Sequence, residues 1–266
     1  MNKKHFFLLC SELKKRNIKN LITIITKREI TENDAKIIAC FRKYLNIVVY
    51  VSYSGLEDAF EKGIRKNGEI EALLSMRNLK KYNIPCFHYW RPLIPQNTND
   101  ATIKTVLDNV KKYCLASCMT GLKLYGFMNC SSYWPEAQKA FDKGINPECF
   151  VPKGSFDKIM QLAKKVRYKV YVDNVCLMAE FMKKPCEYGS YLSERCLKYN
   201  ICSEEQRKIC GKFYDFKKPM TVMIDKKSSF NDIIEYVKKE KVHDMEAFKN
   251  KIEKLNIMKQ SGLISE

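Results

Sequence analysis

The chain has 266 residues, of which 45% are hydrophobic and 12% aromatic, so a wholly disordered protein is excluded. No apolar run approaches the roughly 20 residues that a membrane helix needs. The apolar stretch after the first lysines is too short for a signal peptide. We therefore expect a cytoplasmic protein that has no membrane partner.

Charge is the most unusual property of the composition. Lysine and arginine number 48 against 30 acidic residues, which gives a formal net charge of +18. An excess of this size favours a polyanionic partner such as nucleic acid. The lysines are scattered in pairs along the chain and form no single block. This distribution is also typical of a protein whose whole surface is evenly basic and that has no polyanionic partner. Both interpretations of the charge stay open.

Apolar segments alternate with segments of helical spacing over the first 130 residues. The apolar runs, which are too short for helices, are predicted strands at residues 20–27, 46–54, 85–95 and 121–128. Helices are predicted at residues 5–17, 31–45, 68–83 and 99–118. The second of these helices opens with a threonine or asparagine cap. This alternation is typical of right-handed βαβ units, so we predict an α/β fold with a parallel sheet.

The alternation weakens beyond residue 130. A helix is predicted over 154–169 and a last short strand over 170–174, and a cysteine-containing segment follows. Two amphipathic helices are predicted after residue 219. We therefore expect three parts: an α/β unit over 1–175, a cysteine-rich segment over 176–215 and a small helical unit over 216–266.

The ends of the predicted strands are the first candidate for a functional site. The motifs GxxxxGK[ST], GxGxxG, HExxH and GxSxG are all absent. Parallel α/β sheets bind ligands at the carboxyl ends of their strands. Many strands end in polar residues without a functional reason, but cations there also suit a ligand with a carboxylate or phosphate. The four ends are Thr26-Lys27-Arg28, Ser52-Tyr53-Ser54, Trp90-Arg91-Pro92, and Tyr125-Gly126 with Asn129.

Three phrases in this region carry a resemblance to a known family. They are ITK at the first strand end, VVYVSYS in the second strand, and SMRNLKKYNIPCFHYWRPLIPQNTND across the next helix and strand. The order resembles the carboxyl-terminal half of the barrel in radical S-adenosylmethionine enzymes, and it is most similar to the spore-photoproduct-lyase-like branch. The resemblance covers roughly residues 1 to 130. It implies a partial (β/α) barrel, S-adenosylmethionine and a [4Fe–4S] cluster as cofactors, and radical chemistry on an unidentified substrate, with nucleic acid among the candidates.

The resemblance also implies roles for five residues. Ser52, Ser54 and Arg91 would contact the methionyl or ribose part of S-adenosylmethionine. Thr26 and Lys27 would line the same opening of the barrel. Arginine suits such a role because its planar fork matches a carboxylate.

The sequence departs from this family in one important feature. The family's CxxxCxxC loop, which ligates the cluster, does not occur. Cys114 and Cys118 have the first spacing, but position 121 is glycine, and we interpret these cysteines as one face of a helix. Three explanations follow: the chain is a fragment, another polypeptide supplies the missing strands and their cysteines, or the barrel has lost its chemistry.

Four cysteines gather in the stretch CEYGSYLSERCLKYNICSEEQRKIC, at Cys186, Cys196, Cys202 and Cys210. Disulfides are not expected in a reducing compartment. The spacing lacks the CxxC pair that is typical of zinc, yet the polar flanks differ from those of a buried cysteine. A zinc site, an auxiliary cluster, structural cysteines and a redox role all stay open here, and the metal-site interpretation is the prediction.

Other cysteines and one histidine are predicted to be internal. Cys40, Cys86 and Cys176 lie in apolar surroundings and behave as small hydrophobic residues. His88 shares one strand face with Cys86 and Trp90, and we predict a buried, hydrogen-bonded histidine.

The sequence thus leaves two main functions. One is a radical S-adenosylmethionine-like protein, which is an enzyme only if the missing CxxxCxxC half is supplied. The alternative is a basic nucleic-acid-binding protein with a structural zinc site. A third possibility is an interaction protein that has no ligand.

Overall fold

The computed structural model describes residues 3–56, 65–66, 69–126, 128–145, 149–186, 199 and 201–215. The chain divides into two compact units, residues 1–210 and 211–266. All the elements below belong to the first unit, except that α9 (Glu204–Asp215) extends into the second. The two helices predicted after residue 219 lie outside the described residues.

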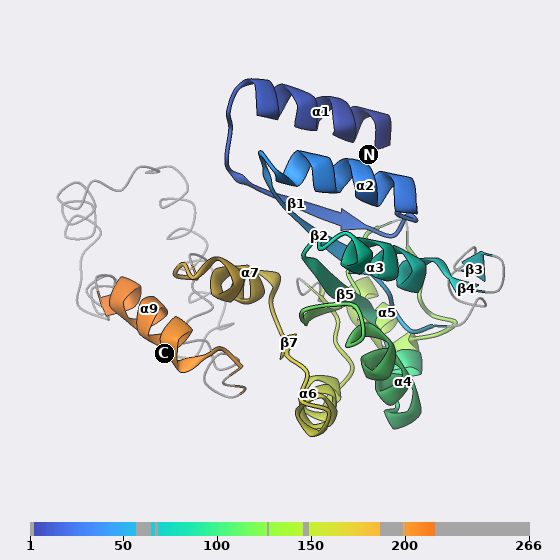
Figure 1. Cartoon of the computed structure of the whole chain (residues 1–266). Coiled ribbons are helices and arrows are strands. Elements are labelled where there is room, and N and C mark those ends of the chain that lie inside the picture. Colours follow the sequence, from blue (N-terminus) through green and yellow to red (C-terminus); the bar gives the residue numbers. More distant parts are fainter. Residues whose placement is uncertain are drawn as a thin grey trace, which may run out of the picture. The chain divides into compact units, whose positions relative to one another are not determined.

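A five-stranded parallel sheet runs through the first unit (Figure 1). Its order is β1-β2-β5-β6-β7, so each strand of the sheet lies beside the one that precedes it in the chain. The short antiparallel pair β3 (Arg65–Lys66) and β4 (Glu69–Ile70) stands apart from it. The predicted α/β class with a parallel sheet is confirmed. The sheet strands are β1 (Leu21–Thr26), β2 (Asn46–Ser52), β5 (Cys86–Leu93), β6 (Ser117–Gly121) and β7 (Val170–Tyr171).

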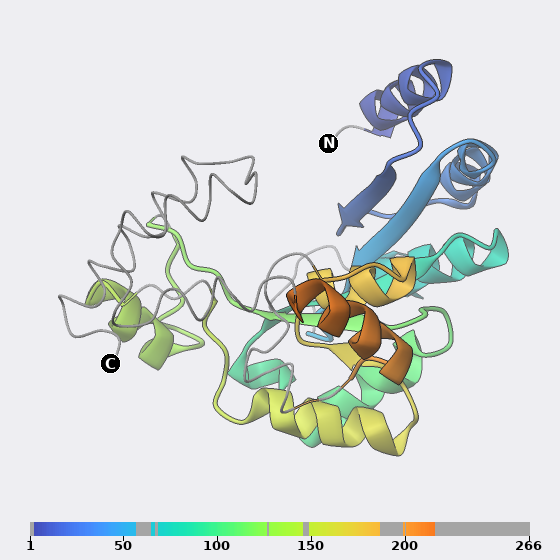
Figure 2. The ribbon, with the colours of Figure 1, turned by 90° about the vertical axis from the view of Figure 1, so that its left-hand side faces the viewer.

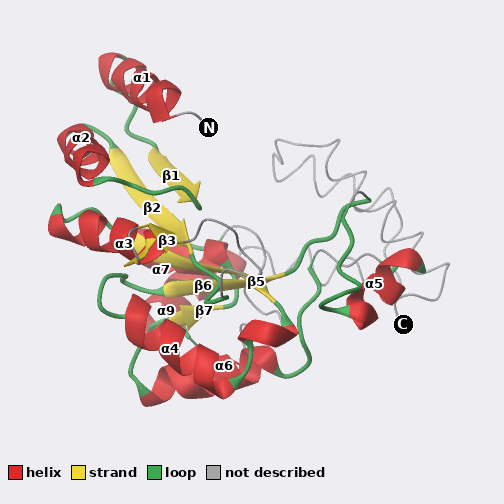
Figure 3. Ribbon diagram, turned by 90° about the vertical axis from the view of Figure 1, so that its right-hand side faces the viewer, coloured by secondary structure: helices red, strands yellow, loops and turns green. Residues whose placement is uncertain are grey.

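Most helices pack on one face of this sheet (Figures 1 and 3). Figures 1 and 2 show α1 beside α2, past the β1 edge. Helix α7 packs on the opposite face, and α5 belongs to a third apolar cluster formed with the chain around Leu122 and Phe150. The helices are α1 (Lys3–Lys15), α2 (Glu32–Arg42), α3 (Glu71–Lys81), the 3₁₀ turn η1 (Pro95–Asn97), α4 (Asp100–Val110), α5 (Pro135–Asp142), α6 (Ser155–Lys165) and α7 (Asn174–Met182).

Side-chain alternation along the strands explains the two layers. In β2, Val49 and Val51 point into the core with α2, α3 and α4, whereas Val48 and Tyr50 belong to the cluster on the other face. Both faces are therefore covered, which explains why the strand is apolar at every position. Each fully buried valine contributes roughly 1.5–3 kcal/mol to folding relative to an exposed one.

The helix cap that the sequence predicted for α2 is confirmed. Thr31 caps α2: its hydroxyl accepts the N–H of Asp34 at 3.2 Å, and the Asp34 carboxylate accepts the N–H of Thr31 at 2.9 Å. Asn99 caps α4 by accepting the N–H of Thr102 at 2.9 Å. These caps satisfy N–H groups that have no partner inside the helix.

The predicted helix over 99–118 and the strand over 121–128 are wrong in their bounds. Helix α4 ends at Val110, and Cys118 lies in β6, so Cys114 and Cys118 do not share a helix face. Pairing with β5 and β7 makes SCMTG a strand although its local propensity is weak. Gly121 fits because a Cβ there would collide with the Phe150 backbone.

The predictions of internal residues are confirmed only in part. Cys86 is buried, but Cys40 is exposed. Ile38 faces the core, and a position two residues further along a helix is rotated by about 200°, so Cys40 points outward. The predicted last strand is shorter than expected, because Asp173 caps α7 by accepting the N–H of Val175 at 2.7 Å.

His88 is a buried, hydrogen-bonded histidine, as predicted. Its Nε2 donates to the Tyr53 carbonyl at 2.8 Å, which leaves Nδ1 to accept from the Ser117 hydroxyl at 2.7 Å. Burial lowers the pKa of His88 to about 4, so its ring is neutral near pH 7. Its role is to connect three neighbouring segments of the sheet.

Candidate ligand-binding site

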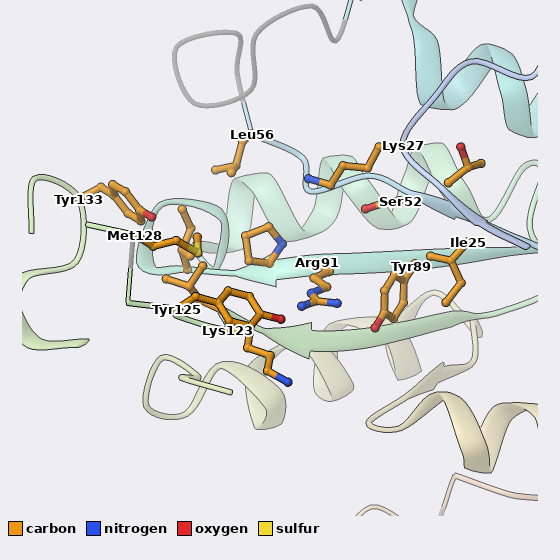
Figure 4. Close-up of a pocket in the computed structure, with 14 residues that line it drawn as sticks. Ile25, Lys27, Ser52, Leu56, Tyr89, Arg91, Lys123, Tyr125, Met128 and Tyr133 are labelled. Atoms are coloured by element: carbon orange, nitrogen blue, oxygen red, sulfur yellow. The ribbon is translucent and has the colours of Figure 1, made fainter. Parts of the chain in front are cut away.

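A cavity of about 540 Å³ opens at the carboxyl ends of β1, β2, β5 and β6 (Figure 4). It contains four of the five strand-end residues that the resemblance implicated, namely Thr26, Lys27, Ser52 and Arg91. Its volume lies within the roughly 300–1,000 Å³ that small-molecule sites occupy. The other lining residues are Ile25, Leu56, Tyr89, Pro92, Ile94, Leu122, Lys123, Tyr125, Met128 and Tyr133.

Strand geometry places the central side chains of this cavity. Tyr89 belongs to the cluster on the sheet face opposite α2, α3 and α4. Ser52 and Arg91 lie two residues after members of that face, Tyr50 and Tyr89, so alternation brings them to the same side. The cavity thus lies over the sheet face opposite α2, α3 and α4, which is also the face on which α7 packs.

Arg91 occupies an irregular point of the sheet. The register between β5 and β6 shifts between Trp90 and Leu93, and the Arg91–Pro92 peptide bond is cis. The Arg91 guanidinium faces the cavity in Figure 4, and its Cζ lies 6.0 Å from the centre of the Tyr89 ring.

The lining is positively charged. It contains three cations, Lys27, Arg91 and Lys123, and none of the 14 lining residues is acidic. Lys27 and Lys123 are exposed, and Arg91 is half-buried. A concave lining that contains cations and no acidic side chain attracts anionic ligands. The cavity is therefore suited to a carboxylate or a phosphate.

Three tyrosine side chains also line the cavity. Tyr89, Tyr125 and Tyr133 line it, and the Lys123 Nζ lies 5.7 Å from the centre of the Tyr125 ring. Burial is the main cause that raises the pKa of Tyr133, so its hydroxyl is un-ionised at neutral pH. Rings beside cations form a surface on which a planar group of a ligand can stack.

Ser54 is the strand-end residue that does not line the cavity. It is 1% exposed, and its hydroxyl accepts the N–H of Leu56 at 3.1 Å. Its carbonyl accepts from Trp90 Nε1 at 3.2 Å and from Asn97 Nδ2 at 2.8 Å. Ser54 thus holds the turn after β2, and its partners explain why it points away from the mouth.

Two contributions to the cavity were missed by the sequence interpretation. Lys123 follows β6, whose end was misplaced, so it was not recognised as a strand-end residue. Met128 and Tyr133 belong to the segment before α5. The alternation of strands and helices gives no prediction for the position of this segment. A correct β6 boundary would have pointed to Lys123, whereas no local signal points to Tyr133.

The cysteine segment is partly described. Cys186 and Cys210 are buried with Ala179, and the Cys186 Sγ lies 3.8 Å from the Cys176 Sγ. Cys202 is half-buried near α7, and Cys196 lies outside the described residues. Within the described ranges, no three histidine, cysteine or carboxylate side chains already surround one metal position. Cys176, predicted to be internal, is half-buried.

The two cofactors implied by the resemblance fit this site differently. Arg91, Lys27 and the tyrosines suit the carboxylate and the adenine ring of S-adenosylmethionine. A [4Fe–4S] cluster does not fit, because no cysteine is among the residues that line the cavity. We therefore derive no radical step from this chain.

Comparisons with family models, with curated proteins and with solved structures found no match. Among the helices that the structure describes, none has the length and apolar character needed to cross a membrane.

Proposed function

We propose that the cavity at the strand ends binds S-adenosylmethionine or a closely similar anionic ligand that carries a planar ring. The observation that carries this proposal is the lining of three cations, three tyrosines and no acidic residue. Arg91 would hold the carboxylate, with Lys27 adding charge from β1 and Lys123 from the chain after β6. Ser52 would supply a small polar contact.

The arrangement of the sheet supports the idea of a partial (β/α) barrel. In such a barrel, neighbouring strands follow chain order, helices cover the outside, and ligands bind over the inner face at the carboxyl ends. The strand order β1-β2-β5-β6-β7 and the position of the cavity are consistent with the first and the last of these features. We propose that α2, α3, α4 and α6 correspond to the outer layer. Helix α7, which packs on the other face, has no counterpart in that scheme.

The radical chemistry implied by the resemblance needs cysteines that this cavity does not supply. In our proposal, this chain contributes ligand binding, and a second polypeptide or further strands would contribute the cluster. The contribution of the described residues is to bind and orient the ligand.

Equilibrium dialysis with radiolabelled S-adenosylmethionine tests the proposal. Arg91→Gln should weaken binding by roughly 10- to 100-fold, since hydrogen bonds to a charged group contribute about 1.5–3 kcal/mol. Lys123→Gln should weaken binding less, because Lys123 is exposed and water screens its charge. ATP, which carries an adenine but no amino-acid group, separates a general anion site from one that prefers an amino acid.

Arg16→Gln is the matched control, because Arg16 is an exposed arginine at the end of α1 and does not line the cavity. It should leave the affinity unchanged. If S-adenosylmethionine does not bind, or if it binds Arg91→Gln as tightly as the original chain, the proposal is wrong. Tight binding of ATP with no binding of S-adenosylmethionine would reject this cofactor and keep an anion site.

The alternative, a basic nucleic-acid-binding protein with structural zinc, stays a prediction. Its net charge of +18 implies that binding to an oligonucleotide weakens steeply as salt rises. Binding that is absent, or that does not respond to salt between 50 and 200 mM (approximately the range in which phosphate contacts are lost), would remove it.

A further inference from the structure

We propose that Cys176, Cys186, Cys202 and Cys210 form a thiolate site for a single Zn²⁺ ion beside α7. Three of these cysteines were predicted as metal ligands from the sequence, but Cys176 was assigned to the core, and Cys196 was expected in its place. The proposal is independent of the cavity at the strand ends.

The distance between two sulfur atoms is the first observation. Zinc binds thiolates at about 2.3 Å in a tetrahedron, which separates neighbouring sulfur atoms by roughly 3.8 Å. The Sγ atoms of Cys176 and Cys186 are 3.8 Å apart. One edge of a zinc tetrahedron is therefore already formed. Ligands of a [4Fe–4S] cluster bind different irons and lie farther apart, so this edge favours a single ion.

The remaining two thiols lie in the same neighbourhood. Cys210 on α9 is buried in one cluster with Cys186 and Ala179, and Cys176 packs against that cluster. Cys202, just before α9, packs with Cys176 in the cluster around Leu177. Both are brought there by the contact between the start of α9 and helix α7. Completing the tetrahedron requires Cys202 and Cys210 to approach the formed edge.

The buried side-chain amide of Gln206 donates a hydrogen bond to the sulfur atom of Cys210. Gln206 is 2% exposed, and its Nε2 donates to the Cys210 Sγ at 3.2 Å and to the Lys184 carbonyl at 2.7 Å. An N–H donor fixes the orientation of a metal-ligating group and stabilises its negative charge. A merely apolar cysteine needs no such partner, so this hydrogen bond favours a ligand role for Cys210.

A second thiol pair provides an internal comparison. Cys86 and Cys114 lie 3.5 Å apart, but both are buried in the large apolar cluster between the sheet and its helices. Cys176, in contrast, lies within electrostatic range of Asp173 and Cys202 as well as Cys186. Two further cysteines, Cys202 and Cys210, pack in the clusters that contain this pair, and together the four supply the number of ligands that zinc takes. We therefore propose a metal for the first pair only.

Elemental analysis of the full chain, reconstituted with Zn²⁺ under reducing conditions and then dialysed, tests the site. We expect about one zinc per chain, in line with four-coordinate structural sites. Cys176→Ser and Cys210→Ser should each lose most of this zinc. Cys114→Ser, the matched control from the other thiol pair, should retain it. A chain without zinc, or full zinc content in Cys176→Ser, would overturn the proposal.

A measurement on the unaltered chain covers the case in which a serine variant fails to fold. Substitution of Co²⁺ for Zn²⁺ should produce the sulfur-to-cobalt charge-transfer absorption and the visible bands of a tetrahedral thiolate site. Stepwise modification of thiols with an organomercurial should release the metal in parallel with the loss of those bands. Cobalt bound without charge-transfer absorption would mean oxygen or nitrogen ligands and would reject the four cysteines.

Discussion

The two faces of the parallel sheet differ although the same strands form both. One face meets α2, α3, α4 and α6, and its buried side chains are mostly aliphatic, with Trp90 and His88 among them. The opposite face carries the aromatic residues Tyr50, Phe87 and Tyr89, packs against α7, and leads to Ser52 and Arg91 at the strand ends.

This difference separates stability from binding within single strands. Trp90 and Arg91 are adjacent in β5, yet Trp90 is 0% exposed in the core and Arg91 lines the cavity. Because neighbouring residues in a strand point to opposite faces, each position can serve one purpose without constraining the next. Substitutions at buried positions such as Trp90 should therefore affect folding, and those at the cavity-lining strand ends should affect binding.

The largest effect is expected at Trp90. Trp90→Ala should lower the free energy of unfolding by about 4 kcal/mol, since the indole leaves a cavity in the core and its hydrogen bond to the Ser54 carbonyl is lost. Urea unfolding followed by circular dichroism measures the change.

Ile25→Ala is the control on the opposite face. Ile25 is a large apolar residue that is 51% exposed, so its truncation should cost no more than about 1 kcal/mol. Equal costs for the two variants would break the distinction between the faces.

The second effect concerns pH and His88. Its pKa is about 4 in the folded chain against an ordinary value of 6.5, so the unfolded state takes up a proton first as the pH falls. Stability is therefore fully present above about pH 6.5 and decreases towards pH 4, by roughly 3 kcal/mol in total.

His88→Gln isolates this contribution, because glutamine keeps an N–H donor but does not titrate. The variant should be less stable at pH 7 and should lose less stability than the original chain between pH 6.5 and pH 4. Parallel curves of unfolding free energy against pH would show that His88 is not responsible.

A third, smaller effect concerns the attachment of α7 to the face opposite α2, α3 and α4. Glu180 accepts from Lys169 Nζ at 2.6 Å, from the Tyr171 hydroxyl at 2.5 Å and from the Ser203 N–H at 3.1 Å. Burial alone would raise the pKa of Glu180, but these three donors outweigh it and lower the pKa. Glu180→Gln should cost about 1–2 kcal/mol in urea unfolding, because the charge-assisted bonds are lost.

Glu204→Gln is the matched control for Glu180. Glu204 forms an exposed ion pair with Lys208 on α9 at 3.1 Å, and such pairs contribute only a few tenths of a kcal/mol. A cost at Glu204 equal to that at Glu180 would mean that Glu180 does not anchor α7.

The sequence predicted the elements whose signals are local. The strands β1, β2 and β5, the Thr31 cap and the buried His88 each follow from runs, caps or alternation over a few residues. The strand β6 was misplaced, because its residues become a strand through pairing with β5 and β7 rather than through local propensity.

The same distinction applies to the sites. Thr26, Lys27, Ser52 and Arg91 could be placed in one cavity because the carboxyl ends of parallel strands meet. The sequence could not show that Ser54 turns into the interior, since its partners Trp90 and Asn97 are about 40 residues away in the chain (36 and 43, respectively). Likewise, the closeness of Cys176 and Cys186 depends on how the chain turns after α7.

The smallest effect on stability is expected at Arg91. Because Arg91 is adjacent to Trp90 in β5, these two residues give the most direct comparison of the two faces of the sheet. Arg91→Gln should change the free energy of unfolding by less than about 0.5 kcal/mol, because Arg91 is only half-buried and its Cζ lies 6.0 Å from the centre of the Tyr89 ring, where the contact is weak. Trp90→Ala, one residue away, should change it by at least about eight times as much. Urea unfolding of both variants under the same conditions measures the ratio. A large loss of stability in Arg91→Gln would mean that the guanidinium holds the sheet together, and weaker ligand binding in that variant would then have a structural cause.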